Sequence, residues 1–188
     1  MIEKALSYIT KRLNEHLNLQ LKLNEDIVVL SNLLNENGKV SSSNENKVFM
    51  TLVNIEQDIT LKNFHPHSGD THQGFQKDTL LDINCYILFA ANFHESNYRI
   101  GLRFISSIIQ YFEANPSFSK QGSPSLPHDI EKLTVELSNQ SVEQVNHLWS
   151  ALGCKYMPSI LYKVRLITIN NNIIVEQIPG IKPIGDEF

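Results

Sequence analysis

The sequence is poor in cysteine and glycine, and each shortage excludes a kind of site. Among 188 residues there are two cysteines, Cys85 and Cys154, and no CxxC pair. Two distant cysteines provide neither a disulfide framework nor a four-cysteine zinc site. We therefore expect no disulfide and a chain that folds in a reducing compartment. The chain has only eight glycines and contains neither glycine-rich phosphate-binding pattern, GxGxxG or GxxxxGKS/T.

The chain also lacks an excess of positive charge and a long apolar run. Its 16 basic and 20 acidic residues give a net charge of -4. Phosphate neutralisation needs a basic face, so we expect no nucleic-acid partner, although a local basic patch would not show in these totals. No stretch approaches the roughly 18 apolar residues of a membrane-spanning helix. We expect no membrane partner and, from the polar start of the chain, no signal peptide.

Signals for enzymatic chemistry are weak. No GxSxG nucleophile elbow occurs, although a dispersed triad would leave no motif. Residues 65–72 contain three histidines and an aspartate, namely His65, His67, Asp70 and His72. Imidazole and carboxylate bind transition metals, but a loop of Gly, Pro and Ser does not by itself make these side chains converge. A solvated loop is the simpler interpretation, and a metal site is the alternative.

Three segments have the periodicity of helices. The first apolar stripe, at three- and four-residue steps, consists of Ile2, Leu6, Ile9, Leu13 and Leu17. Residues 97–113 predict a longer central helix that Pro116 ends. Its predicted apolar stripe consists of Tyr98, Leu102, Ile105, Ile109 and Phe112, and Phe104, Ile108 and Tyr111 widen it. Ser141 and Gln144 fit a capping box for a short third helix that ends at Gly153.

Alternating apolar residues predict a sheet. The predicted strands cover residues 27–30, 48–59, 80–90, 131–137, 160–169 and 173–178. Strand 48–59 is apolar on both faces, which is typical of a central strand covered on both sides. Three consecutive asparagines at 170–172 predict a hairpin between the last two strands. Residues 1–178 thus indicate one α+β domain, in which a mainly antiparallel sheet packs against the central, N-terminal and third helices.

Residues 179–188 are predicted to be an extended C-terminal tail. Two prolines and two glycines in PGIKPIG exclude a helix. Ile181 and Ile184 are regularly placed along this tail, which is compatible with strand addition to the sheet edge of a neighbour. A frayed end is the alternative.

Residues 148–165 combine the only tryptophan, Trp149, with basic and aromatic residues around Pro158. The strand that follows has one wholly apolar face, which comprises Ile160, Tyr162, Val164 and Leu166. The opposite face is mixed and comprises Leu161, Lys163, Arg165 and Ile167. Mixed surfaces with aromatic residues and arginine are favoured at interfaces, and an ordinary two-sided strand under a helix is the alternative. The residues alone leave both interpretations open.

This stretch, LWSALGCKYMPSILYKVR, resembles the tube-terminator, or cap, proteins of extracellular contractile injection systems, the phage-tail-like particles typified by the antifeeding prophage. NYRIGLRFISSIIQYF, at residues 97–112, looks like the central helix of that family. The opening helix, with Asn54, Ile55 and Glu56, looks like its N-terminal half. The resemblance covers nearly the whole chain and is most specific at residues 148–165, where Cys154 replaces another small residue. The His-rich loop is not a feature of the family.

The resemblance implies a structural protein without catalytic activity or cofactor, with a fold similar to phage tail terminators. It implies a ring, a homohexamer, that caps the last ring of the inner tube, stops polymerisation and links the tube end to the sheath. The partners would be other copies of the chain, the inner tube protein and the sheath protein. Assembly in the bacterial cytoplasm, within a particle that is later released, is a further expectation. Another assembly or adaptor subunit of the same particle is the alternative.

The residues that we expect at interfaces with these partners are Trp149, Lys155, Tyr156, Pro158, Lys163, Arg165, Ile181 and Ile184.

Overall fold

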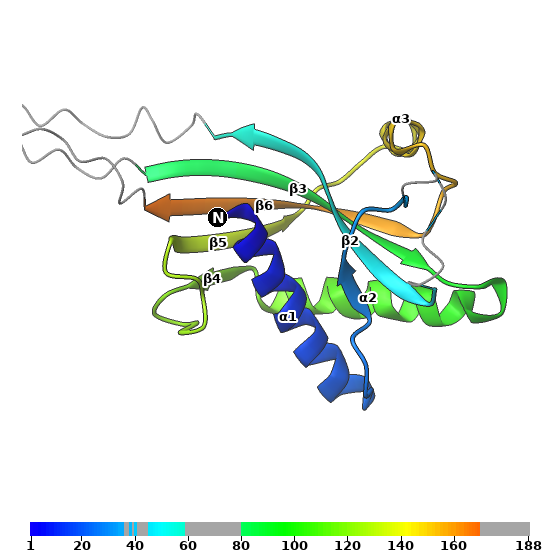
Figure 1. Ribbon diagram of the computed structural model, residues 1–188, viewed down its shortest axis with the longest axis horizontal. Helices are drawn as coiled ribbons and strands as arrows, with labels where there is room; N and C mark the ends of the chain where they lie inside the picture. The colour runs from blue at the N-terminus through cyan, green and yellow to red at the C-terminus, as the bar shows by residue number, and fades with distance from the viewer. Residues whose placement is uncertain (36–37, 39, 41–44, 59–79, 170–188) are drawn as a thin grey trace, which may run out of the picture.

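The computed structural model describes residues 1–35, 38, 40, 45–58 and 80–169 (Figure 1). Its helices are α1 (Ile2–Leu21), the short 3-10 helix η3 (Glu95–Asn97), α2 (Tyr98–Ala114) and α3 (Val142–Leu152). Its strands are β1 (Val28–Leu30), β2 (Lys47–Gln57), β3 (Leu80–Asn92), β4 (Ser117–Ser119), β5 (Ile130–Leu137) and β6 (Ser159–Ile169). The predicted α+β class is confirmed, and β4 is a strand that the sequence pattern did not reveal.

The strands form one six-stranded sheet in the order β1-β2-β3-β6-β5-β4. Every pairing is antiparallel except that of β1 with β2, which is parallel. β6 lies in the middle, because β3 pairs along its whole length and β5 pairs with it from Tyr162 to Thr168. The predicted hairpin partner, residues 173–178, lies outside the described residues. From Tyr162 to Thr168, both edges of β6 are paired, so no further strand could pair with β6 there.

The helix α1 buries the stripe predicted from its periodicity. Leu6, Ile9, Leu13 and Leu17 are all buried in the main hydrophobic core. Asn14, on the same helix, is also buried, and its side-chain amide bonds the backbone of the strand beside it. Its Oδ1 accepts from the N–H groups of Ile27 and Val28 at 3.0 and 2.8 Å, and its Nδ2 donates to the carbonyl of Val28 at 2.9 Å. Asn14 thus fixes β1 to α1 as a neighbouring strand would.

The helix α2 is in place, and Phe104, Ile108, Tyr111 and Phe112 of its predicted stripe are buried, but one edge of that stripe is exposed. Its buried positions are Gly101, Phe104, Ser107, Ile108, Tyr111 and Phe112. Tyr98 and Leu102, predicted to be in the core, are 50% and 39% exposed. The reason is the close approach at Gly101, where a Cβ atom would lie 3.0 Å from the Phe93 ring and 3.4 Å from the Cβ of Ala91. Because glycine has no side chain, this side of α2 settles nearest the sheet and carries Tyr98 and Leu102 outward.

The face of the sheet covered by α1 and α2, which we call the inner face, contains most of the core (Figure 1). An aromatic cluster lies at its centre. The Phe89 ring is 5.8 Å from both Phe112 and Tyr162, and the last two are 4.8 Å apart. The predicted apolar face of β6 is confirmed here, since Tyr162, Val164 and Leu166 are buried and Ile160 is partly buried against them.

Candidate assembly interface on the outer face

Among the described residues, the opposite side of the sheet, which we call the outer face, is covered by a helix at one end only. In Figure 1, α3 lies over the end where β6 begins, and no other helix of the described ranges covers the strands beyond it. An antiparallel sheet can leave one face in contact with solvent or a partner. The outer face therefore divides into an apolar end beneath α3 and an open end along β6.

The short helix α3 has the ends that the sequence predicts. The Ser141 hydroxyl accepts from the N–H of Gln144 at 3.2 Å, while the Gln144 side chain accepts from the N–H of Ser141 at 2.8 Å. Gly153 ends the helix in the left-handed conformation, with φ of 68°. Two reciprocal hydrogen bonds and a glycine terminus hold this helix in register. The side of α3 that turns toward the sheet is its apolar one.

That side carries Trp149, which is 4% exposed. Its ring belongs to a second, smaller hydrophobic cluster, whose other buried members are Leu33, Phe49, Leu88, Ala90 and Leu161. The two open interpretations of Trp149 were a core residue and an interface residue. Its burial within a single chain favours the first, because an indole already removed from water has little surface left to offer a partner.

The loop after α3 holds three more of the predicted interface residues. Tyr156 is 65% exposed, and its ring lies edge-on to Trp149 with centroids 5.7 Å apart. Lys155 is also exposed, whereas Pro158 is half-buried and its carbonyl accepts a 2.9 Å hydrogen bond from the N–H of Ala91. The structure thus brings Tyr156 and Lys155 to the surface directly beside buried Trp149. This arrangement, an exposed aromatic supported by a buried one, is suited to contact with another chain.

A groove of about 240 Å³ lies between α3 and the adjoining ends of β5 and β6. It is lined by Leu88, Leu137, Ser138, Asn139, Gln140, Val145, Leu148, Trp149, Ser159, Ile160 and Leu161. None of these side chains is charged. The indole nitrogen Nε1 of Trp149 is buried without a hydrogen-bond partner in the described part of the chain. Sequence reasoning missed this groove, because its lining residues come from four separate segments.

Lys163 and Arg165 lie further along β6, on the open end of the outer face. Arg165 forms an ion pair with Asp58, whose carboxylate oxygen lies 3.1 Å from the arginine Nε and whose side chain is 4% exposed. Lys163 stands between Tyr86 of β3 and Glu136 of β5 in the register of the sheet. Asp58 gave no recognisable signal in the sequence, since it follows the last residue of β2 and lies far from Arg165 along the chain.

Tyr86, which lies opposite Lys163 in the sheet, forms a hydrogen bond with Glu56. The Tyr86 hydroxyl donates to the Glu56 carboxylate at 3.1 Å. Partial burial, and then the hydrogen bond and the negative charge of Glu56, raise the pKa of Tyr86. The open end is therefore a polar surface of both charges, with Lys163 and Arg165 as its cations on β6. It can make charge-paired contacts with another chain.

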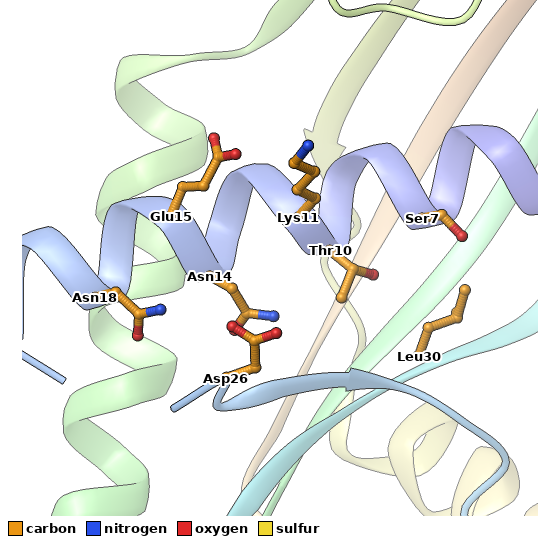
Figure 2. Close-up of a pocket in the computed structure, with 8 residues that line it drawn as sticks. All are labelled: Ser7, Thr10, Lys11, Asn14, Glu15, Asn18, Asp26 and Leu30. Carbon is orange, nitrogen blue, oxygen red and sulfur yellow. The ribbon is translucent and has the colours of Figure 1, made fainter. Parts of the chain in front are cut away.

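A second groove, of about 420 Å³, lies between α1 and the segment leading into β1. Figure 2 shows its lining residues, with Asn14 directed from α1 toward that segment. Because the amide of Asn14 is engaged by the backbone of Ile27 and Val28, it is not available to bind a ligand. The rest of the lining mixes Lys11 with Glu15 and Asp26. This groove is best explained as the packing boundary between α1 and the segment that leads into β1.

Two groups of predicted residues lie outside the described residues: the His-rich segment 65–72, and Ile181 and Ile184. Within the described ranges, no three His, Cys, Asp or Glu side chains come together as a metal site would require. In the same ranges, no helix has both the length and the apolar character needed to cross a membrane. Cys85 is buried and Cys154 half-buried, and both are free thiols.

The described residues thus form an α+β domain whose outer face carries a neutral groove and a charged end. Comparison with known protein families identifies the family of the chain. It belongs to the Pvc16 N-terminal domain family, whose model matches residues 6–182. No curated protein gives a significant match.

Two solved cryo-EM structures are similar in fold. One is the sheath/tube terminator of an extracellular contractile injection system, PVC, in its extended state, with a TM-score of 0.52 and 17% identity over 94% of this chain. The other is the tube-terminating cap of the anti-feeding prophage, with a TM-score of 0.53 and 15% identity, also over 94% of this chain. This chain spans 62% and 60% of the lengths of those two proteins. The family resemblance read from residues 148–165 is thereby confirmed.

Proposed function

We propose that this chain is a structural cap that ends the inner tube of a phage-tail-like contractile injection particle and links the tube end to the sheath. The observation that carries the proposal is the family match over residues 6–182, together with the fold likeness to a sheath/tube terminator and a tube-terminating cap. The proposed activity is assembly without catalysis. The cap is built in the bacterial cytoplasm and becomes part of a particle that is released.

The proposed cap is a ring, a homohexamer, whose partners are other copies of the chain, the inner tube protein and the sheath protein. A ring repeats each contact at every subunit, so a moderate interface per copy is sufficient. The two ends of the outer face support this view. One exposes Tyr156 and Lys155 beside a neutral groove, and the other carries half-buried Lys163 and Arg165 among acidic side chains. We assign the contacts with other chains to these two surfaces and to the tail, residues 179–188.

Electron microscopy of particles assembled without this protein tests the proposal. If the chain is the terminator, its loss gives tubes of abnormal length or sheaths that fail to stay attached. If it is instead a baseplate-side or adaptor subunit, its loss abolishes particles altogether, and the proposal is wrong. Light scattering of the purified chain, with and without tube protein, tests ring formation separately.

A further inference from the structure

The helix α2 has two apolar sides, and only one of them packs fully on the sheet. The packed side contains Phe104 and Ile108. Tyr98 and Leu102 on the other side are exposed, and the two isoleucines that continue their row are half-buried. The row recurs at steps of four, three and four residues, which places its members along one side of a helix. It consists of Tyr98, Leu102, Ile105 and Ile109.

Two arginines border this row. Arg99 and Arg103 are both exposed, and neither takes part in an ion pair within the described residues. They stand four residues apart on one helix, where like charges repel each other. We call Tyr98, Arg99, Leu102 and Arg103 the α2 patch. A surface that complements this patch has exposed apolar side chains next to unpaired carboxylates.

The corner between β5 and α3 has this complementary chemistry. Leu137, at the end of β5, is 41% exposed, and Val142, at the start of α3, is 79% exposed. Each adjoins an exposed carboxylate in sequence, Glu136 and Glu143 respectively, and neither carboxylate is in an ion pair within the described ranges. Leu137 lines the groove beneath α3 together with Val145 of the first helical turn, so the two ends of the corner lie close together. We call Glu136, Leu137, Val142 and Glu143 the β5–α3 corner.

The two carboxylates have roles in the single chain that leave them at the surface. Glu143 lies in the first turn of α3, where the helix dipole favours a negative charge. Glu136 stands opposite Lys163 in the register of the sheet. Because both side chains stay exposed in these positions, both are accessible to cations of another chain.

The α2 patch and the β5–α3 corner lie on opposite sides of the sheet. In Figure 1, α2 packs on the inner face, whereas α3 packs on the outer face. The two surfaces therefore do not meet within one copy, but they can meet between two copies. A contact between two different surfaces is heterologous, and its repetition closes into a ring when the rotation between copies allows. Pairing of one α2 patch with another would instead bring arginines together.

We propose that the α2 patch of one copy binds the β5–α3 corner of the next copy, with apolar side chains in contact and the two arginines against the two glutamates. This inference rests on the ring assembly proposed above and names the contact between its subunits. The contact has an apolar centre with a charged rim, and tyrosine and arginine are favoured at such interfaces. Each copy contributes both surfaces, so a closed ring buries every patch and every corner.

Reversal of charge tests the contact. A patch variant, Arg99→Glu with Arg103→Glu, and a corner variant, Glu136→Lys with Glu143→Lys, should each weaken ring association on tube protein roughly tenfold or more. The reason is that every contact then joins like charges. Light scattering measures association, and circular dichroism checks that both variants are folded. The matched control, with the same change of net charge as the patch variant, reverses the exposed residues Lys11 and Lys22.

An equal mixture of the patch variant and the corner variant gives a sharper result. In a ring that alternates between them, each reversed patch meets a reversed corner, and each native patch meets a native corner. Ring association should therefore return to the level of the parent chain. A folding defect in either variant would not be repaired by mixing. If both variants are folded and the mixture does not recover, the proposed contact is wrong.

Disulfide trapping tests the apolar part of the contact. In a Cys154→Ala background, a chain with both Leu102→Cys and Val142→Cys should give a ladder of linked chains on a non-reducing gel after mild oxidation on tube protein. Gln110→Cys replaces Leu102→Cys in the matched control, because Gln110 is exposed on the polar side of α2. Linked dimers from a chain with Leu102→Cys alone would show that α2 pairs with α2, which overturns the inference.

The outcomes separate this inference from the proposed function. If rings form on the tube and neither charge-reversed variant weakens them, the contact is wrong and the cap proposal stands. If the patch variant still forms rings but no longer binds tube protein, the tube protein covers the α2 patch, and the inference is again overturned. If no ring forms even with tube protein, the proposed function itself fails, and the contact fails with it.

Discussion

The two faces of the sheet differ in how much of them is buried by helices. The inner face is covered along its length by two amphipathic helices and holds a cluster of aromatic rings at Phe89, Phe112 and Tyr162. In the part of the chain that the structure describes, the outer face has a single short helix over one end, a small cluster around Trp149, and an open end that carries the Arg165–Asp58 ion pair. Both faces belong to the same strands, and side chains alternate between them.

The difference shows how the sheet divides its apolar burial between its two faces. Continuous apolar burial on the inner face provides most of the free energy of folding. The outer face needs to bury only enough to hold α3, and under the proposed function its remaining surface contacts other chains. Substitutions on the inner face should therefore unfold the chain, whereas those on the outer face should affect folding less and assembly more.

The largest effect is expected at the centre of the inner face. Phe89→Ala removes a ring that is 1% exposed and lies against Phe112 and Tyr162. The loss should be about 3–5 kcal/mol of unfolding free energy, from lost burial plus the cavity that remains. Urea denaturation followed by circular dichroism measures it. A loss below about 1 kcal/mol would show that the inner face is not the main source of stability.

The next largest effect is expected at Trp149, in the smaller hydrophobic cluster of the outer face. Trp149→Ala should cost about 3 kcal/mol, because the indole is buried in a smaller cluster beneath a single helix. Circular dichroism during urea denaturation, beside light scattering, separates folding from assembly. A variant that stays as stable as the parent chain but no longer forms rings would place Trp149 at the interface instead.

Alkaline pH should probe the inner face through Tyr162. Burial, and then the negative charge of Glu113, raise the pKa of Tyr162 from its ordinary value of 10.0 to about 12. The unfolded chain therefore loses this proton before the folded chain does. The contribution of Tyr162 to the unfolding free energy is therefore present in full below pH 10. It falls by about 1.4 kcal/mol per pH unit between the pKa of the unfolded chain, 10.0, and that of the folded chain, about 12.

Tyr162→Phe is the matched variant for the alkaline experiment. The Tyr162 hydroxyl has no hydrogen-bond partner within the described residues, so its removal should cost little at neutral pH. Urea denaturation at pH 8, 10 and 11 should give a smaller decline for the variant than for the parent chain. Equal declines would show that Tyr162 is not the group responsible.

The smallest effect is expected on the open end of the outer face. Arg165→Met leaves the nearly buried carboxylate of Asp58 without the cation 3.1 Å away. Full loss of a buried pair is more costly, but Arg165 is 33% exposed, so about 1–2 kcal/mol is expected. Lys163→Met, on the same face of β6, is the control and should change stability by less than about 0.5 kcal/mol. Equal effects in chemical denaturation would show that the ion pair does not contribute.

Much of the fold could be predicted because its signals are local. The stripe of α1, the capping box at Ser141 and the apolar face of β6 each follow from short periodic patterns. The predicted stripe of α2 was wrong at Tyr98 and Leu102. The sequence periodicity shows which side of the helix is apolar. The close contact of Gly101 with Phe93 determines which part of that apolar side packs on the sheet. β4 was missed because three residues are too few to show a pattern.

The candidate site was predictable only in part. The sequence indicated Lys155, Tyr156, Lys163 and Arg165 as candidates, and the structure places all four on the outer face or beside it. It did not indicate the groove or Asp58, because both depend on strands that are distant in sequence and become neighbours only through the order β2-β3-β6-β5.

By itself, the sequence determined the α+β class, the secondary structure of most elements and the family, since composition, periodicity and the stretch at residues 148–165 are properties of the linear chain. Only the tertiary structure decided that Trp149 is buried by its own sheet and that β6 has a partner on each edge. The same holds for the neutral groove beneath α3. The physical reason is that burial, strand order and concave surfaces arise between segments, and no single segment carries a signal for them.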